Sequence, residues 1–168
     1  MHISTKKIAY LGLLIALACV FSYVEILIPV NIGVPGAKLG LANLVIIVAL
    51  YTLGEGDAFL LSMLRIVLVG FTFGNMASMI YSLAGGILSF AVMVLAKKMK
   101  RLSVTGVSVL GGVFHNVGQI IVAILVVETA SLIYYLPVLI LAGTLSGVAI
   151  GMLGAMVTKR IGNKNKCL

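Results

Sequence analysis

The chain has 168 residues, of which 62% are hydrophobic and 10% charged, and its formal net charge is +8. A soluble domain of this length carries roughly a quarter charged residues, so the composition excludes a soluble fold and predicts one membrane domain spanning residues 1–168. The basic residues stand in short clusters beside apolar stretches without interleaved aromatic residues, which argues against a nucleic-acid partner.

Six apolar stretches predict an all-α integral membrane protein with six transmembrane helices, because spanning β-strands would alternate polar and apolar residues. In chain order the stretches are residues 8–28, 39–54, 57–73, 79–96, 105–127 and 131–157. Turn-forming residues separate them, and Asp57 is a predicted N-cap of the third helix.

The first stretch has a second interpretation. Lys6 and Lys7 followed by an apolar run with Cys19 also resemble a secretory or lipoprotein signal. The apolar run continues past Cys19 for about twenty residues in total, which is long enough to span a bilayer. We therefore expect a retained helix.

The basic clusters predict the orientation in the membrane. They comprise Lys6 and Lys7, the segment Lys97–Arg101, and the segment Lys159–Lys166. An even number of predicted helices separates each cluster from the next, so all three can lie on the cytoplasmic side, as the positive-inside rule requires. Both termini are then cytoplasmic.

Two helices, 39–54 and 57–73, are short for a span. Short helices bounded by glycine often build the binding sites of transporters, although tilt or local thinning of the bilayer would accommodate them equally well.

Small residues are spaced for close helix packing. Gly143, Gly147 and Gly151 share one face of the last helix, and Gly12 and Ala16 share a face of the first. Such faces pack against other helices of the same chain or dock a partner.

Polar side chains inside the predicted spans mark a candidate binding site, because their desolvation is costly without partners. These residues lie in the middle and outer half of the membrane: Lys38, Asn43, Arg65, Asn75, Tyr81, Ser82, His115, Asn116 and Gln119. Cationic donors outnumber the one nearby acid, Glu25, which favours an anionic or phosphorylated ligand. In the alternative, structural interpretation, Arg65 forms an ion pair with Glu25, and the side-chain amides form hydrogen bonds between helices.

Catalytic motifs are missing from the sequence. It has four acidic residues without metal-binding spacing, no phosphate-binding glycine loop with lysine, and no Cys/His cluster. We therefore expect no catalytic residues, no metal, no cofactor and no enzymatic activity of the chain alone.

Four ordered motifs resemble the family called Gx transporters, also labelled heptaprenyl diphosphate synthase component I. They are Ile32–Asn43, Phe73-Gly74-Asn75, Tyr81–Gly86 and Phe114–Gln119. The family is similar to the substrate-binding S components of energy-coupling factor (ECF) importers, which take up vitamins across the cell membrane of prokaryotes. That resemblance implies six helices with cytoplasmic termini, a loop at residues 29–38 that helps close over substrate, and separate coupling and ATPase subunits. It also implies that Gly12 and Ala16 dock the coupling subunit.

The synthase label implies a different role. Prenyl diphosphate synthases hold magnesium and diphosphate with aspartate-rich motifs, whereas this chain has one aspartate. Under that label the chain would be a non-catalytic membrane accessory in quinone biosynthesis, with another chain performing the reaction.

Overall fold

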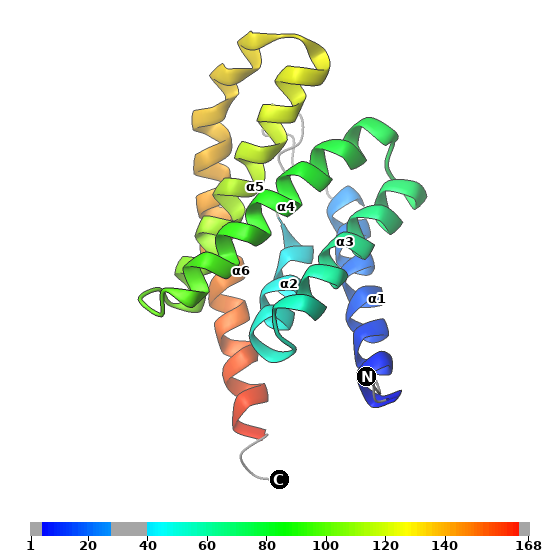
Figure 1. Cartoon of the computed structure of the whole chain (residues 1–168), viewed down its shortest axis with the longest axis vertical. Coiled ribbons are helices and arrows are strands. Elements are labelled where there is room, and N and C mark those ends of the chain that lie inside the picture. The colour runs from blue at the N-terminus through cyan, green and yellow to red at the C-terminus, as the bar shows by residue number, and fades with distance from the viewer. Residues whose placement is uncertain (1–4, 28–39, 165–168) are drawn as a thin grey trace.

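The computed structural model describes residues 5–27 and 40–164, which form α-helices joined by short turns (Figure 1). In chain order the helices are α1 (Thr5–Leu27), α2 (Leu41–Thr52), α3 (Glu55–Thr72), α4 (Met76–Lys98), α5 (Val104–Val127), the 3-10 helix η1 (Ala130–Tyr135) and α6 (Leu136–Lys164). The described residues contain no strand, which confirms the prediction of an all-α protein.

Four segments are long and apolar enough to cross a membrane. They are Lys7–Leu27, Met76–Lys98, Val104–Val127 and Ala130–Ile161. Large apolar side chains also cover their outer surface, for example Leu125 and Leu145, which are 70% and 73% exposed. Exposed apolar surface on this scale requires a lipid environment, so the chain is a membrane protein.

The other two helices depart from the usual spanning pattern for physical reasons. α2 has 12 residues, and α3 carries Glu55, Asp57 and Arg65 within its 18 residues. Seven of the twelve residues of α2 are buried and the other five are half-buried, as expected for a helix that is apolar on all sides and surrounded by protein. The predicted count of six membrane crossings therefore remains a prediction.

The six helices form a closed ring. α1 packs against α2, α2 against α6, α6 against α5, α5 against α4, α4 against α3, and α3 returns to α1. Packed apolar side chains fill the end of the ring where α1 begins, around Ile46, Leu50, Leu61 and Val107. The opposite end lacks this filling and contains the cavity described below.

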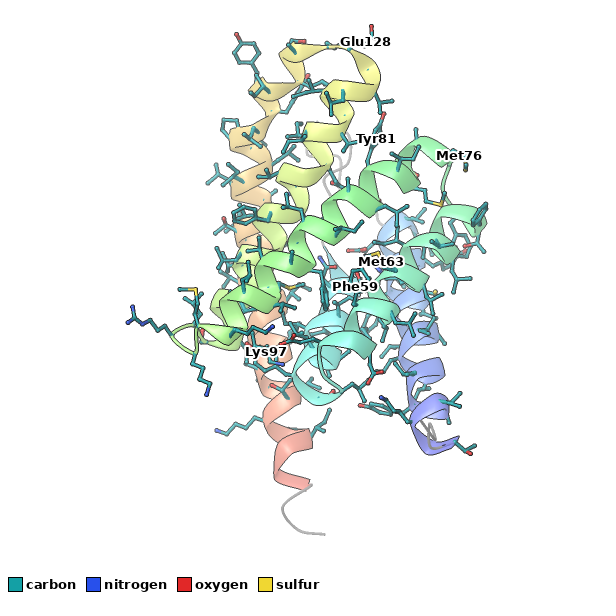
Figure 2. All side chains as sticks on the ribbon, in the orientation of Figure 1. Phe59, Met63, Met76, Tyr81, Lys97 and Glu128 are labelled. Carbon is teal, nitrogen blue, oxygen red and sulfur yellow. The ribbon has the colours of Figure 1, made fainter. Side chains whose placement is uncertain are left out.

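The first and last helical turns of the chain lie at the same end of the ring, together with the α2–α3 and α4–α5 turns (Figure 1). At this end Lys7 pairs with Asp57 (Nζ to Oδ2, 2.7 Å) and Lys98 pairs with Glu55 (3.3 Å). Lys97, labelled in Figure 2, donates to the Leu50 carbonyl at 2.7 Å, where α2 leaves its last carbonyls without helical partners. The clustered lysines thus hold the α2–α3 hairpin.

Asp57 does not cap α3. The N-cap is Gly54, whose φ of 104° suits glycine in the two-residue connection, and its cap uses no side chain. Asp57 is the third residue of the helix, where a carboxylate is favoured by the helix dipole.

The sixth helix begins later than predicted. Residues 130–135 form η1, and α6 starts at Leu136. Pro137 explains the start, because proline lacks an amide hydrogen and is tolerated in the first turn of a helix. At its other end α6 continues to Lys164, where basic residues favour a helix C-terminus.

The glycine face of α6 packs inside the chain. A Cβ on Gly143 would lie 2.8 Å from the Gly112 oxygen, and Cβ atoms on Gly147 and Gly151 would lie 2.6 Å from the Cα atoms of Val109 and Thr105. All three contacts are with α5, so the packing interpretation of this face is confirmed. Gly12 differs, because a Cβ there would meet no heavy atom of the described residues within 4 Å.

Candidate functional site

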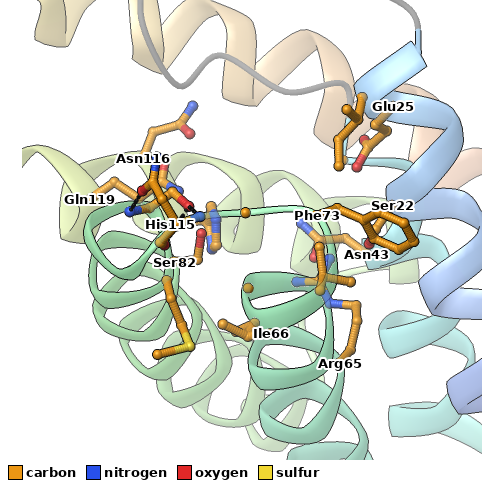
Figure 3. Close-up of a pocket in the computed structure, with 18 of the residues that line it drawn as sticks. Ser22, Glu25, Asn43, Arg65, Ile66, Phe73, Ser82, His115, Asn116 and Gln119 are labelled. Atoms are coloured by element: carbon orange, nitrogen blue, oxygen red, sulfur yellow. Dashed lines mark hydrogen bonds between the residues drawn. The ribbon is translucent and has the colours of Figure 1, made fainter.

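A polar cavity of about 330 Å³ lies inside the helix ring, and residues from all six α-helices line it (Figure 3). Its described lining includes seven of the predicted site residues: Asn43, Arg65, Asn75, Ser82, His115, Asn116 and Gln119. Lys38 lies outside the described residues. Tyr81 is not among the described lining residues, because on α4 Ser78 and Ser82 face the cavity and Tyr81 is turned about a quarter of a helical turn away.

Arg65 lies in the middle of α3 on the cavity wall. Its Nε atom is buried and has no hydrogen-bond partner among the described residues. No ion pair within 4 Å joins Arg65 to a carboxylate of the described residues. A buried guanidinium edge without a partner is costly, which makes it a candidate ligand contact.

Ser22 on α1 is the second buried group of this kind. The residue is 6% exposed, lines the cavity, and its Oγ atom has no partner among the described residues. Figure 3 shows it near Phe73 and Asn43, on the same side of the cavity as Arg65. Sequence reasoning missed Ser22, although its three-residue spacing from Glu25 places both on one helical face.

Glu25 accepts a hydrogen bond from the backbone amide of Leu41 (Oε1 to N, 2.6 Å). Leu41 is the first residue of α2, so the carboxylate satisfies a free amide and meets the positive end of the helix dipole. Arg65 and Glu25 interact electrostatically, but they form no ion pair within 4 Å. The Arg65–Glu25 pairing anticipated as the alternative is therefore present only as a longer-range attraction.

Asn75 has a structural task at the rim. Its Oδ1 atom accepts from the Ser78 amide at 2.7 Å, and the Ser78 hydroxyl accepts from the Asn75 amide at 3.1 Å. This capping box fixes the start of α4 and presents both residues to the cavity.

His115, Asn116 and Gln119 lie on α5, across the cavity from Arg65 (Figure 3). Asn116 donates a hydrogen bond from Nδ2 to the Leu139 carbonyl of α6 at 2.7 Å. The alternative, structural interpretation of the polar residues predicted interhelical hydrogen bonds of this kind. Gly85 and Gly118 bring α4 and α5 into backbone contact beside these residues. The α4–α5 side of the cavity is thus a rigid wall of uncharged or weakly basic polar groups.

Comparison with known proteins agrees with the resemblance found in the sequence. The model of the family described as heptaprenyl diphosphate synthase component I matches residues 14–157, which include every described cavity residue. The chain belongs to this family. No curated protein and no solved structure matched it. The family's name describes a component of a synthase, in agreement with the prediction that the chain is not by itself an enzyme.

Proposed function

We propose that the chain is the substrate-binding membrane subunit of an ECF-type importer for a small anionic or phosphorylated molecule related to a vitamin or an isoprenoid. The observation that carries this proposal is the polar cavity in the helix ring, where Arg65 Nε and Ser22 Oγ are buried without partners among residues 5–27 and 40–164. Its volume is at the lower end of the range for small-molecule sites. The similarity of the family to S components supports the same role.

In this proposal all six helices cross the cell membrane of a prokaryote, and both termini are cytoplasmic. The common end of the ring that carries Lys7, Lys97 and Lys98 would face the cytoplasm, as the positive-inside rule favours. The cavity would then open toward the outside, above the apolar core. Coupling and ATPase subunits would dock from the cytoplasmic half, with Gly12 and Ala16 on the docking face.

The test is gentle purification of the chain from native membranes. We expect an acidic small molecule to be detected by mass spectrometry, together with a membrane coupling subunit and ATP-hydrolysing subunits. The Arg65→Ala variant should lose the small molecule while retaining its folded yield, whereas Gly12→Leu should lose the other subunits and retain the small molecule. Recovery of neither a small molecule nor such subunits in the unmodified protein would refute the proposal.

The family name supports a second candidate function, a non-catalytic accessory of heptaprenyl diphosphate synthase. Such a role predicts that deletion changes the prenyl chain products while uptake of small anions stays normal. The cavity favours the importer, because eleven of its nineteen described lining residues carry polar or charged side chains. A long isoprenoid chain would require a mostly apolar channel instead.

A further inference from the structure

We propose that Arg65 and Ser22 form a subsite for a single carboxylate of the transported molecule, while the α4–α5 wall binds the uncharged polar remainder. This inference rests on the proposed function and names the chemical class of the substrate. It follows from the two orphaned donors, from the acid beside them, and from the different character of the opposite wall.

The first step concerns the Arg65 guanidinium. A guanidinium offers parallel N–H groups along its Nε edge, which match the two oxygens of a carboxylate in a bidentate contact. In Arg65 this Nε is the buried atom without a partner among the described residues. The side-on edge therefore carries an N–H group that is available to a ligand inside the cavity.

Ser22 supplies a second donor from another helix. Its hydroxyl is buried and unpartnered among the described residues, and its residue lines the same cavity as Arg65. The cost of two orphaned polar atoms disappears when one acceptor group satisfies both. A group with two oxygens, each able to accept more than one hydrogen bond, meets that requirement.

The charge of the subsite favours a carboxylate over a phosphate or diphosphate. Arg65 is the one guanidinium among the described lining residues, and it balances one negative charge. Glu25 lines the same cavity, interacts electrostatically with Arg65, and would repel a multiply charged group. The backbone amide of Leu41 donates a hydrogen bond to the Glu25 carboxylate, which keeps this carboxylate at the cavity wall.

The opposite wall has a different chemistry. Ser82 and Gln119 offer neutral donors and acceptors there, with the Gly85–Gly118 contact fixing their helices. Neutral groups of this type form hydrogen bonds with hydroxyl and amide groups of a ligand, and these bonds require no charge on the ligand. The cavity therefore fits a molecule with one acid group at one end and polar uncharged groups at the other.

Nitrogen-15 NMR of arginine-labelled protein in lipid nanodiscs tests the subsite directly. The chain has three arginines, and both Arg101 and Arg160 are exposed. The Nε–H signal of Arg65 is assigned by its disappearance in Arg65→Lys. Acetate, inorganic phosphate and chloride are then titrated separately at constant ionic strength.

We expect acetate to shift the Arg65 signal saturably in the millimolar range, with smaller and unsaturable changes for Arg101 and Arg160. Ser22→Ala should weaken acetate binding about tenfold. A larger response to phosphate than to acetate would overturn the carboxylate assignment. The subsite itself is refuted if chloride reproduces the acetate effect or if Arg65 does not respond.

The outcome separates this inference from the proposed function. Arg65→Lys keeps the charge but lacks the fork, so it should lose the small molecule that the unmodified protein retains on purification. Retention by Arg65→Lys would refute the subsite and leave the importer role intact. A saturable acetate response in a protein that recruits no coupling or ATPase subunits would support the subsite and contradict the importer role.

Discussion

Ser22 and Ser89 are both buried serines inside the helix ring, but their hydroxyl groups are in opposite situations. Ser89 on α4 donates to the Gly111 carbonyl of α5 at 2.7 Å, whereas Ser22 has no partner among the described residues. We expect Ser89→Ala to lower the free energy of unfolding by about 1 kcal/mol, because interhelical bonds in membranes contribute on that scale. Ser22→Ala should leave it unchanged or slightly higher. Denaturant unfolding in mixed micelles measures both, and an equal loss in the two variants would contradict the assignment.

Arg65 provides a second test of whether polar groups in the cavity lack partners in the empty protein. A buried charge without a close partner destabilises the empty protein, so Arg65→Met should preserve or raise the free energy of unfolding. If Arg65 and Glu25 instead formed a stabilising pair, Arg65→Met would cost several kcal/mol and Glu25→Gln would show strong coupling to it. A double-mutant cycle with these two substitutions measures the coupling energy between Arg65 and Glu25. We expect this energy to be below about 1 kcal/mol.

The sequence predicted most of the cavity because polar residues are conspicuous in apolar helices. Asn43, Arg65, His115 and Gln119 stand out for this reason, and the structure brings them to one cavity. Ser22 was not predicted as a cavity residue, because serine is common in membrane helices and the burial of Ser22 depends on tertiary packing. The task of Asn75 as a helix cap depended on the start of α4, which the sequence placed three residues too late.

At the scale of the helix, the contact between α5 and α6 depends on glycine. A Cβ on Gly147 would lie 2.6 Å from the Val109 Cα and 3.0 Å from the Ser108 oxygen, and backbone atoms cannot rotate away. We expect Gly147→Ala to separate the two helices and lower the thermal unfolding temperature of the purified chain by several degrees.

Gly12→Ala is the matched control, since a Cβ there meets no described heavy atom within 4 Å. It should leave the unfolding temperature unchanged or raise it slightly, because alanine has the higher helix propensity. A comparable loss in both variants would mean that the α5–α6 contact does not cause the destabilisation, since alanine has the higher helix propensity at both positions. No change in Gly147→Ala would show that the contact is looser than the structure has it.

The sequence also predicted the number of helices better than their ends. Hydropathy reports which segments are apolar, but local chemistry sets where a helix starts. Pro137 delays α6 and leaves η1 before it, and Gly54 takes the cap position expected for Asp57. Hydropathy alone also gave no account of why α2 can be so short, which follows from its burial against α1, α3 and α6.

At the scale of the whole molecule the helix ring is asymmetric. Packed apolar side chains and the ion pairs of α1, α3 and α4 occupy one end, while the cavity occupies the other. This division suits a protein that binds a small molecule on one side of a membrane and a partner on the other. It also makes the orientation of the chain testable at each turn between helices.

Single cysteines placed in a Cys19→Ser, Cys167→Ser background report that orientation through labelling with a membrane-impermeant maleimide. Four exposed positions sample successive turns: Gly56, Ala77, Lys100 and Tyr134. Six crossings with cytoplasmic termini predict labelling of Ala77→Cys and Tyr134→Cys in intact cells, and labelling of Gly56→Cys and Lys100→Cys only after permeabilisation. Labelling of Gly56→Cys in intact cells would show that α2 and α3 enter and leave on the outer side, so that four helices cross. Reversal of the entire pattern would place the basic clusters outside and refute the proposed orientation of the cavity.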